Sequence, residues 1–287
     1  MCRLFGMSGG PEPVRATFWL LQAPDSLQQQ SRREPDGAGI GTFDAGGSPV
    51  VDKQPLAAYE DRRFAEGARD LESRTFVAHV RYASSGKLTM PNTHPFERDG
   101  RLFAHNGVIG DLERLEAELG EAGGLVQGET DSERFFALIT REIERTDTDD
   151  VGAGIAAAAR WVAGNVPVLS INCVLVTASD LWALRYPDTH DLFVLQREAG
   201  GGALRHASTD RIRVRSEALS DRPAVVVATE RMDDDPSWRP LRSGELLHVD
   251  SELGVSSRQI IAEPPAQPLT LADLGERAAA SQAGGAR

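Results

Sequence analysis

The sequence predicts an α+β fold in which antiparallel sheets and helices lie in separate layers. Strand-like and helix-like segments occur in groups along the 287 residues, and they do not alternate strictly as they would in a doubly wound parallel sheet. The sequence also contains no internal repeat. A chain of this length has room for one large domain or two small ones.

Five segments have the periodicity of an amphipathic helix. In the clearest of them, Phe135, Phe136, Ile139 and Ile143 fall on one face. The predicted helices cover residues 13–22, 58–71, 111–119, 130–145 and 151–164.

The strand-like segments are short and rich in β-branched and aromatic residues. Residues 169–187 are expected to form two strands joined by a turn at Ala178-Ser179-Asp180, and residues 244–256 a late hairpin. Single strands are predicted for residues 75–84, 101–110, 190–198 and 223–230. Residues 261–287 are rich in Pro, Ala and Gly and are expected to form a flexible C-terminal tail after a domain at 1–260.

Composition excludes several classes of partner and compartment. The formal net charge of −12 argues against nucleic acid and anionic membranes as partners. Two cysteines provide neither a disulfide framework nor a CxxC metal pattern. No signal peptide and no apolar run of about 18–20 residues is present, so a soluble, cytoplasmic protein is expected.

The opening letters MCRLFG place a cysteine directly after the initiator Met. If Met1 is removed, Cys2 carries a thiol and a free α-amine on one residue. The α-amine titrates near ~7.7–8.0, so it can accept a proton close to neutral pH. A terminal nucleophile with its own base is a known way to activate a thiol. The alternative is an incidental cysteine in a frayed terminus.

Two further polar clusters lie on strand-like segments. In EPDGAGIGTF at 34–43, Asp36, Gly37, Gly39 and Gly41 lead into an apolar run, and a turn before a strand explains this pattern. In HVRYAS, alternation places His79 and Arg81 on the same face of a strand. The guanidinium could pair with a carboxylate, or the strand could be an edge strand with a solvated face.

AHNGVIG and GETDSERFF each have a structural and a functional interpretation. Asn106-Gly107 is a hairpin-turn signal, but an Asn side-chain N–H and a Gly backbone N–H could also form an oxyanion hole. Thr130 and Glu133 fit a helix capping box. Asp131, at the first position of that helix, could in addition bind an ammonium group.

The order of these motifs is more specific than any one of them. Cys2 is followed by PDGAG, HVRYAS, NTHPF, AHNG and TDSE, and the chain resembles the class II glutamine amidotransferases, whose amidohydrolase domain belongs to the N-terminal nucleophile (Ntn) hydrolase family. The resemblance is closest to stand-alone members and reaches about residue 260 through ATERMDDDPSW. It implies a four-layer αββα sandwich of two antiparallel sheets and a glutaminase domain over residues 1–260.

The resemblance implies a role for five residues. Cys2 attacks the side-chain amide of glutamine and forms a γ-glutamyl thioester, with its own α-amine as the base. Asn106 and Gly107 stabilise the oxyanion. Arg81 binds the α-carboxylate of the glutamyl group and Asp131 binds its α-ammonium. No metal and no organic cofactor is required.

Three functions share these residues. The first is an amidohydrolase that releases ammonia from glutamine. The second is a hydrolase of a larger γ-glutamyl amide, similar to the ergothioneine-pathway enzyme. The third is an inactive γ-glutamyl-binding module. No acceptor domain is recognised in the sequence, so any ammonia acceptor is expected to be a separate synthase subunit.

Overall fold

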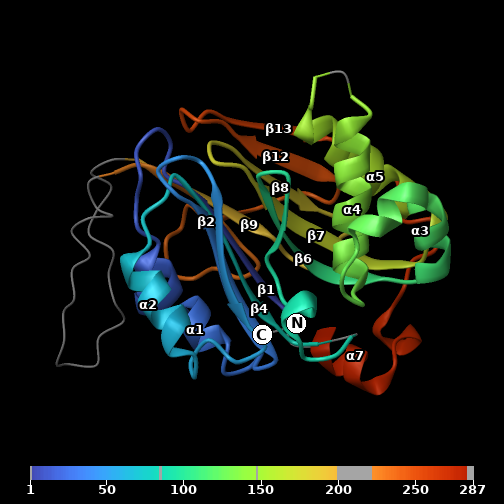
Figure 1. Ribbon diagram of the computed structural model, residues 1–287, viewed down its shortest axis with the longest axis horizontal. Coiled ribbons are helices and arrows are strands. Elements are labelled where there is room, and N and C mark those ends of the chain that lie inside the picture. The colour runs from blue at the N-terminus through green and yellow to red at the C-terminus, as the bar shows by residue number, and fades with distance from the viewer. Residues whose placement is uncertain (1, 84–85, 147, 199–221, 283–287) are drawn as a thin grey trace.

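The computed structural model describes residues 2–83, 86–146, 148–198 and 222–282. Two antiparallel sheets lie face to face, with helices on both outer sides (Figure 1). The α+β class and the four-layer αββα arrangement are therefore confirmed.

The first sheet has seven strands, and the strand that follows Cys2 lies at its centre. The order is β11-β9-β10-β1-β4-β2-β3. All neighbouring strands pair antiparallel. In chain order the strands are β1 (Arg3–Ser8), β2 (Gly37–Phe43), β3 (Pro49–Gln54), β4 (Thr75–Arg81), β9 (Phe193–Arg197), β10 (Ala224–Ala228) and β11 (Arg239–Pro240).

The second sheet has six strands in the order β13-β12-β8-β7-β6-β5. Its longest pairing joins β6 and β7, from Leu102 opposite Val176 to Ile109 opposite Val168. Its strands are β5 (Phe96–Arg98), β6 (Arg101–Ile109), β7 (Val168–Val176), β8 (Leu181–Arg185), β12 (Glu245–Val249) and β13 (Val255–Gln259).

The helices form two groups on opposite sides of the sandwich (Figure 1). The seven-stranded sheet is covered by the π-helix η1 (Phe18–Gln22), α1 (Leu27–Gln30) and α2 (Arg62–Asp70). The six-stranded sheet is covered by α3 (Leu112–Leu119), the 3-10 helix η3 (Gly120–Leu125), α4 (Asp131–Glu144) and α5 (Val151–Asn165). The remaining elements are η2 (Met90–Asn92), η4 (Leu271–Asp273) and α7 (Glu276–Gln282).

Apolar side chains fill three layers, one under each helical group and one between the sheets. In β4, Phe76, Ala78 and Val80 face the α1–α2 side, whereas Val77 faces the other sheet. β4 lies between β1 and β2, so it is not an edge strand, and all seven of its residues are buried. The alternative of an edge strand with a solvated face is therefore wrong.

The predicted helix at 13–22 is wrong over its first half. Val14 forms an isolated antiparallel bridge with Ser73, with backbone hydrogen bonds of 2.9 and 3.1 Å, so the chain is extended there. The predicted helix at 58–71 begins later than expected, at Arg62, because Asp61 caps it by accepting from the Arg63 N–H.

The segment after residue 260 packs against the rest of the domain. Ala266 N–H donates to the Ala163 carbonyl at 2.8 Å, and Pro268 bridges to Val168. Further along, the Gln282 side chain contacts His190, with 2.9 Å between Oε1 and Nε2. The domain boundary at 260 and the flexibility of the tail stay predictions. Within the described part of the chain, no helix is both long enough and apolar enough to span a bilayer.

Candidate active site

A small cavity lies where β1 and β4 meet the start of α4. Its volume is about 20 Å³, close to the space that one water molecule needs. The lining residues are Cys2, Arg81, Tyr82, His94, His105, Gly107, Thr130, Asp131 and Ser132.

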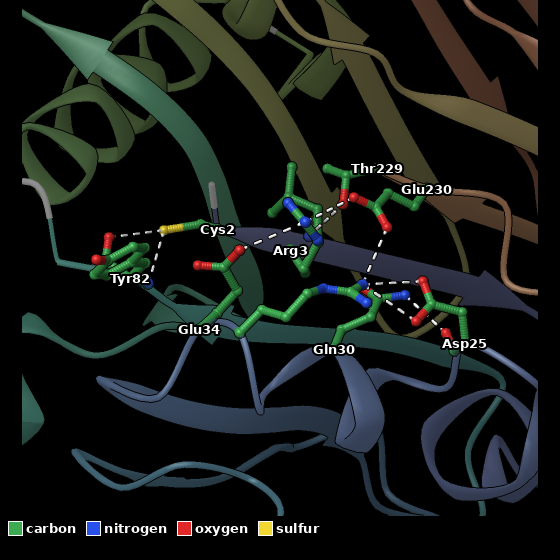
Figure 2. A network of polar contacts seen from close by, with 10 residues as sticks. Cys2, Arg3, Asp25, Gln30, Glu34, Tyr82, Thr229 and Glu230 are labelled. Carbon is green, nitrogen blue, oxygen red and sulfur yellow. Dashed lines mark hydrogen bonds and ion pairs between the residues drawn. The ribbon is translucent and has the colours of Figure 1, made fainter. Parts of the chain in front are cut away.

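Cys2 is held against the backbone that follows β4. The Tyr82 N–H donates to Sγ at 3.3 Å and the thiol donates to the Tyr82 carbonyl at 3.3 Å (Figure 2). Burial raises the pKa of the Cys2 thiol, an effect that the Tyr82 hydrogen bond and the charge of Arg81 oppose and the charge of Glu34 reinforces. A thiol in this environment needs a nearby base to become a nucleophile.

Arg81 is the last residue of β4, and its side chain is buried at the cavity. Its Nη1 donates to the Lys87 carbonyl at 3.1 Å, which fixes the guanidinium against the loop before η2. On the other side, the Asp36 N–H donates to the Arg81 carbonyl at 2.9 Å and joins the start of β2 to β4. A guanidinium has five N–H donors, so the bond to Lys87 is compatible with a bidentate contact to a carboxylate.

Asp131 is buried at the first position of α4. One carboxylate oxygen accepts from the Ile109 N–H at 2.9 Å and the other from the Ser132 N–H at 2.9 Å. These bonds tie the helix to the end of β6 and hold the carboxylate at the cavity. Each carboxylate oxygen has a second lone pair, so Asp131 can accept further hydrogen bonds from an ammonium group.

The capping box at this helix forms only in part. Thr130 is the N-cap and accepts from the Glu133 N–H at 3.2 Å, as expected. The Glu133 carboxylate does not bond back to Thr130. It accepts instead from the N–H groups of Gln127 and Gly128, at 2.9 and 2.6 Å, and so orders the loop before the helix.

Asn106 and Gly107 lie within β6, opposite Asn172 and Ile171 of β7. The hairpin-turn interpretation is therefore wrong. Gly107 lines the cavity. Asn106 has the same alternation along β6 as Leu102 and Ala104, which pack between the two sheets, so its side chain faces that space too. The Asn106 carboxamide is fully buried, and neither of its polar atoms has a hydrogen-bond partner among the described residues. An unpaired buried amide is costly unless something binds it.

Two cavity residues, His94 and His105, were not assigned a role from the sequence. His105 Nε2 lies 3.3 Å from the Ser170 carbonyl, which can only accept, so the proton is on Nε2. Nδ1 then accepts from the Ser132 hydroxyl at 2.9 Å. The ring of His94 lies against that of His79, with centroids 4.1 Å apart and the ring planes tilted by 38°. Burial lowers the pKa of all three imidazoles, so they are neutral near pH 7.

The fold therefore brings Cys2, Arg81, Gly107 and Asp131 to one cavity, and Asn106 directly precedes Gly107 in β6. The second cysteine is separate from them. Cys173 is buried in β7, and burial raises the pKa of its thiol to about 12. No group of three or more His, Cys, Asp or Glu side chains within the described ranges could hold a metal ion.

Comparisons with known proteins identify relatives of this chain. An uncharacterized protein of Methanocaldococcus jannaschii is 29% identical over 231 residues, which cover 78% of this chain and 63% of the relative. The Escherichia coli protein YafJ, provisionally named a glutamine amidotransferase, is 27% identical over 85% of this chain and 96% of its own length. The chain thus spans less than two thirds of the methanogen protein but almost all of YafJ.

Solved structures share the fold at low sequence identity. Glutamine phosphoribosylpyrophosphate amidotransferase from B. subtilis superposes with a TM-score of 0.64 and 20% identity, over 92% of this chain and 50% of that enzyme. A class II glutamine aminotransferase domain protein from Silicibacter pomeroyi superposes with a TM-score of 0.58, over 91% of this chain and all of that protein.

The model of the family described as "Glutamine amidotransferases class-II" matches residues 1–267. Members of this family hydrolyse the amide of glutamine and transfer the ammonia. The match covers most of the chain and agrees with the sandwich fold. This protein therefore belongs to the class II glutamine amidotransferases.

Proposed function

We propose that this protein cleaves the side-chain amide of glutamine through a thioester on Cys2. One observation carries the proposal: Cys2, Arg81, Gly107 and Asp131 come from four distant segments and line one cavity. The buried Asn106 carboxamide, which directly precedes Gly107 in β6, has no hydrogen-bond partner among the described residues. These groups match what amide cleavage requires, namely a nucleophile, oxyanion donors and charged groups that orient the substrate.

The reaction begins after removal of Met1. The α-amine of Cys2 takes the thiol proton, Sγ attacks the amide carbon, and the carbonyl oxygen becomes an oxyanion. The Gly107 N–H and the Asn106 side-chain N–H donate to that oxygen. Collapse of the intermediate breaks the C–N bond, and the α-ammonium returns its proton to the departing nitrogen, which leaves as ammonia. Water then hydrolyses the thioester to glutamate and restores the thiol.

Arg81 and Asp131 bind the other end of the substrate. The α-carboxylate of glutamine pairs with the guanidinium, and its α-ammonium pairs with the Asp131 carboxylate. Both side chains are already held by backbone hydrogen bonds, Arg81 to Lys87 and Asp131 to Ile109 and Ser132. Little side-chain entropy is then lost on binding, which favours affinity.

The ammonia acceptor is proposed to lie on a separate synthase subunit. Class II glutamine amidotransferase domains often act beside a synthase domain, as in the much longer glutamine–fructose-6-phosphate aminotransferase of Bradyrhizobium diazoefficiens, of which this chain covers 26%. Localisation in the cytoplasm remains an expectation from the sequence.

The test is incubation of the purified protein with glutamine and with a panel of larger γ-glutamyl amides, scoring released ammonia or amine. Ammonia from glutamine, abolished in Cys2→Ser, supports the proposal. Preferential release of amine from a larger γ-glutamyl amide identifies the second function instead. No release from any glutamyl substrate by protein lacking Met1 refutes both.

A further inference from the structure

Glu34 is a buried carboxylate next to the nucleophile, and the mechanism above does not use it. It lies just before β2, with 3% of its side chain exposed. Its Oε1 is 3.5 Å from Nη2 of Arg3, the residue that follows Cys2. Figure 2 shows the Glu34 carboxylate between Cys2 and the Arg3 guanidinium. The negative charge of Glu34 acts on the Cys2 thiol, in agreement with this closeness.

Arg3 is shared by two carboxylates, and they lie on different sides of it. Nη2 of Arg3 is 2.6 Å from Glu230, which follows β10 and is 30% exposed. Glu230 in turn pairs with Arg33 at 3.3 Å, and Arg33 with Asp25 at 3.2 Å. Figure 2 shows this outer part of the network on the side of Arg3 away from Cys2. Of the two acids on Arg3, Glu34 is therefore the one beside the start of the chain.

We propose that Glu34 is a positioning residue that accepts a hydrogen bond from the α-amino group of Cys2 once Met1 is removed. The inference rests on the proposed function, in which that amine is the general base. A carboxylate at this place aims the amine and favours its protonated form, because opposite charges a few ångströms apart stabilise each other in a site shielded from water. The base then has to lose its proton at a higher pH before it can activate Sγ.

Other charged groups near the start of the chain also influence the pH at which the α-amine of Cys2 titrates. Glu34 faces Arg3 of β1 and Arg33, while Cys2 faces Arg81 of β4. Asp36 and Asp131 act on Arg81. His190 lies within the influence of Arg3, and burial lowers the pKa of its imidazole. Replacing Glu34 alters the charge nearest the amine and leaves all of these in place.

The experiment compares Glu34→Gln with Glu230→Gln. Each variant removes one carboxylate from Arg3 and leaves the other, so an effect transmitted only through Arg3 appears in both. Intact mass first establishes that Met1 is absent. The pH dependence of α-amine acylation, followed by mass spectrometry, then reports the amine titration without any need for enzyme activity. The acid limb of kcat/KM with glutamine is measured in parallel.

In Glu34→Gln, the amine titration and the acid limb should both move to lower pH by about 1 unit, the low end of the effect of an adjacent opposite charge. Glu230→Gln should leave both unchanged. Glu34→Asp, which keeps the charge on a shorter side chain, should shift in the same direction by less and serves as the test if Glu34→Gln does not fold.

Equal shifts in Glu34→Gln and Glu230→Gln, or no shift in either, would overturn the inference. If Glu34→Gln shifts the amine titration but the protein cleaves no glutamyl amide, the inference about Glu34 stands and the proposed function is wrong. If the protein hydrolyses glutamine but Glu34→Gln leaves the amine titration unshifted, the proposed function stands and the inference about Glu34 is wrong. Retained Met1 in an active protein would remove both, since the nitrogen of Cys2 would be an amide.

Discussion

Gly107→Ala should destabilise the protein, because a methyl group at residue 107 would collide with the backbone of β7, the strand paired with β6. A Cβ on Gly107 would lie 1.8 Å from the Ser170 carbonyl oxygen and 2.4 Å from its carbon. Ser170 belongs to β7, which pairs with β6 along its whole length. The obstructing atoms are backbone, so they cannot turn aside as a side chain could. The two strands must separate locally, and the Gly107 N–H moves with them.

The magnitude follows from the rigidity of the contact. Inserting a methyl group into a packed core costs typically ~1–3 kcal/mol when neighbours can adjust. Here they are fixed by the β6–β7 hydrogen bonds, so we expect about 3 kcal/mol or more. For a chain of this size each kcal/mol lowers Tm by roughly 2–4 °C, which gives a loss of about 6–12 °C.

Gly164→Ala is the matched control. Gly164 is an exposed residue of α5, and a Cβ there meets nothing within 4 Å. Replacing a helical glycine by alanine should stabilise by roughly 0.5–1 kcal/mol. Tm is measured by calorimetry and glutaminase activity by ammonia release. If Gly107→Ala kept the Tm and activity of the parent protein, both the packing of β6 on β7 and the proposed oxyanion donor would be wrong.

Three further predictions concern the chemistry. Intact mass should show loss of Met1 from active protein, and a variant in which Met1 is retained should be inactive; full turnover by such a variant would exclude the α-amine as base. Cys2→Ser should lose nearly all ammonia release while keeping its Tm, whereas Cys173→Ser should stay within a few-fold; labelling of Cys173 instead of Cys2 by a thiol-reactive glutamine analogue would contradict this. Arg81→Lys and Asp131→Asn should each weaken transition-state binding by roughly 1.5–3 kcal/mol, about ten- to a hundredfold in kcat/KM. In Asp131→Asn the preference for glutamine over an analogue without the α-amine should also shrink, and an undiminished preference would leave Asp131 only a helix-start residue.

The sequence predicts helices best where the local residue pattern and the tertiary packing favour the same structure. The predicted helices at 130–145 and 151–164 match α4 and α5 within one residue at each end, because each has a strong N-cap and packs on the six-stranded sheet. The order of the motifs, starting from Cys2, led to the family that the chain belongs to.

Long-range contacts explain what the sequence did not reveal. Asn106-Gly107 favours a turn locally, but pairing with β7 on one side keeps the chain extended. Glu34 stands in a run of charged residues typical of an exposed turn, but in the fold it is buried and lies 3.5 Å from Arg3 of β1, a contact between segments far apart in the sequence. β1 was missed as a strand because all six of its residues are buried, so it has no alternation of polar and apolar positions.

The central place of β1 also has a consequence for how the protein reaches its active state. Phe5 pairs with Ala78 on one side and with Ala228 on the other, so one edge of β1 finds its partner only after most of the chain has been synthesised. Such distant contacts are slow to form. The residue before this strand is the proposed nucleophile, and incomplete chains therefore hold Cys2 on a strand with an open edge. Hydrolysis of glutamine should begin only when the last quarter of the protein has folded onto the first, which keeps nascent chains from releasing ammonia.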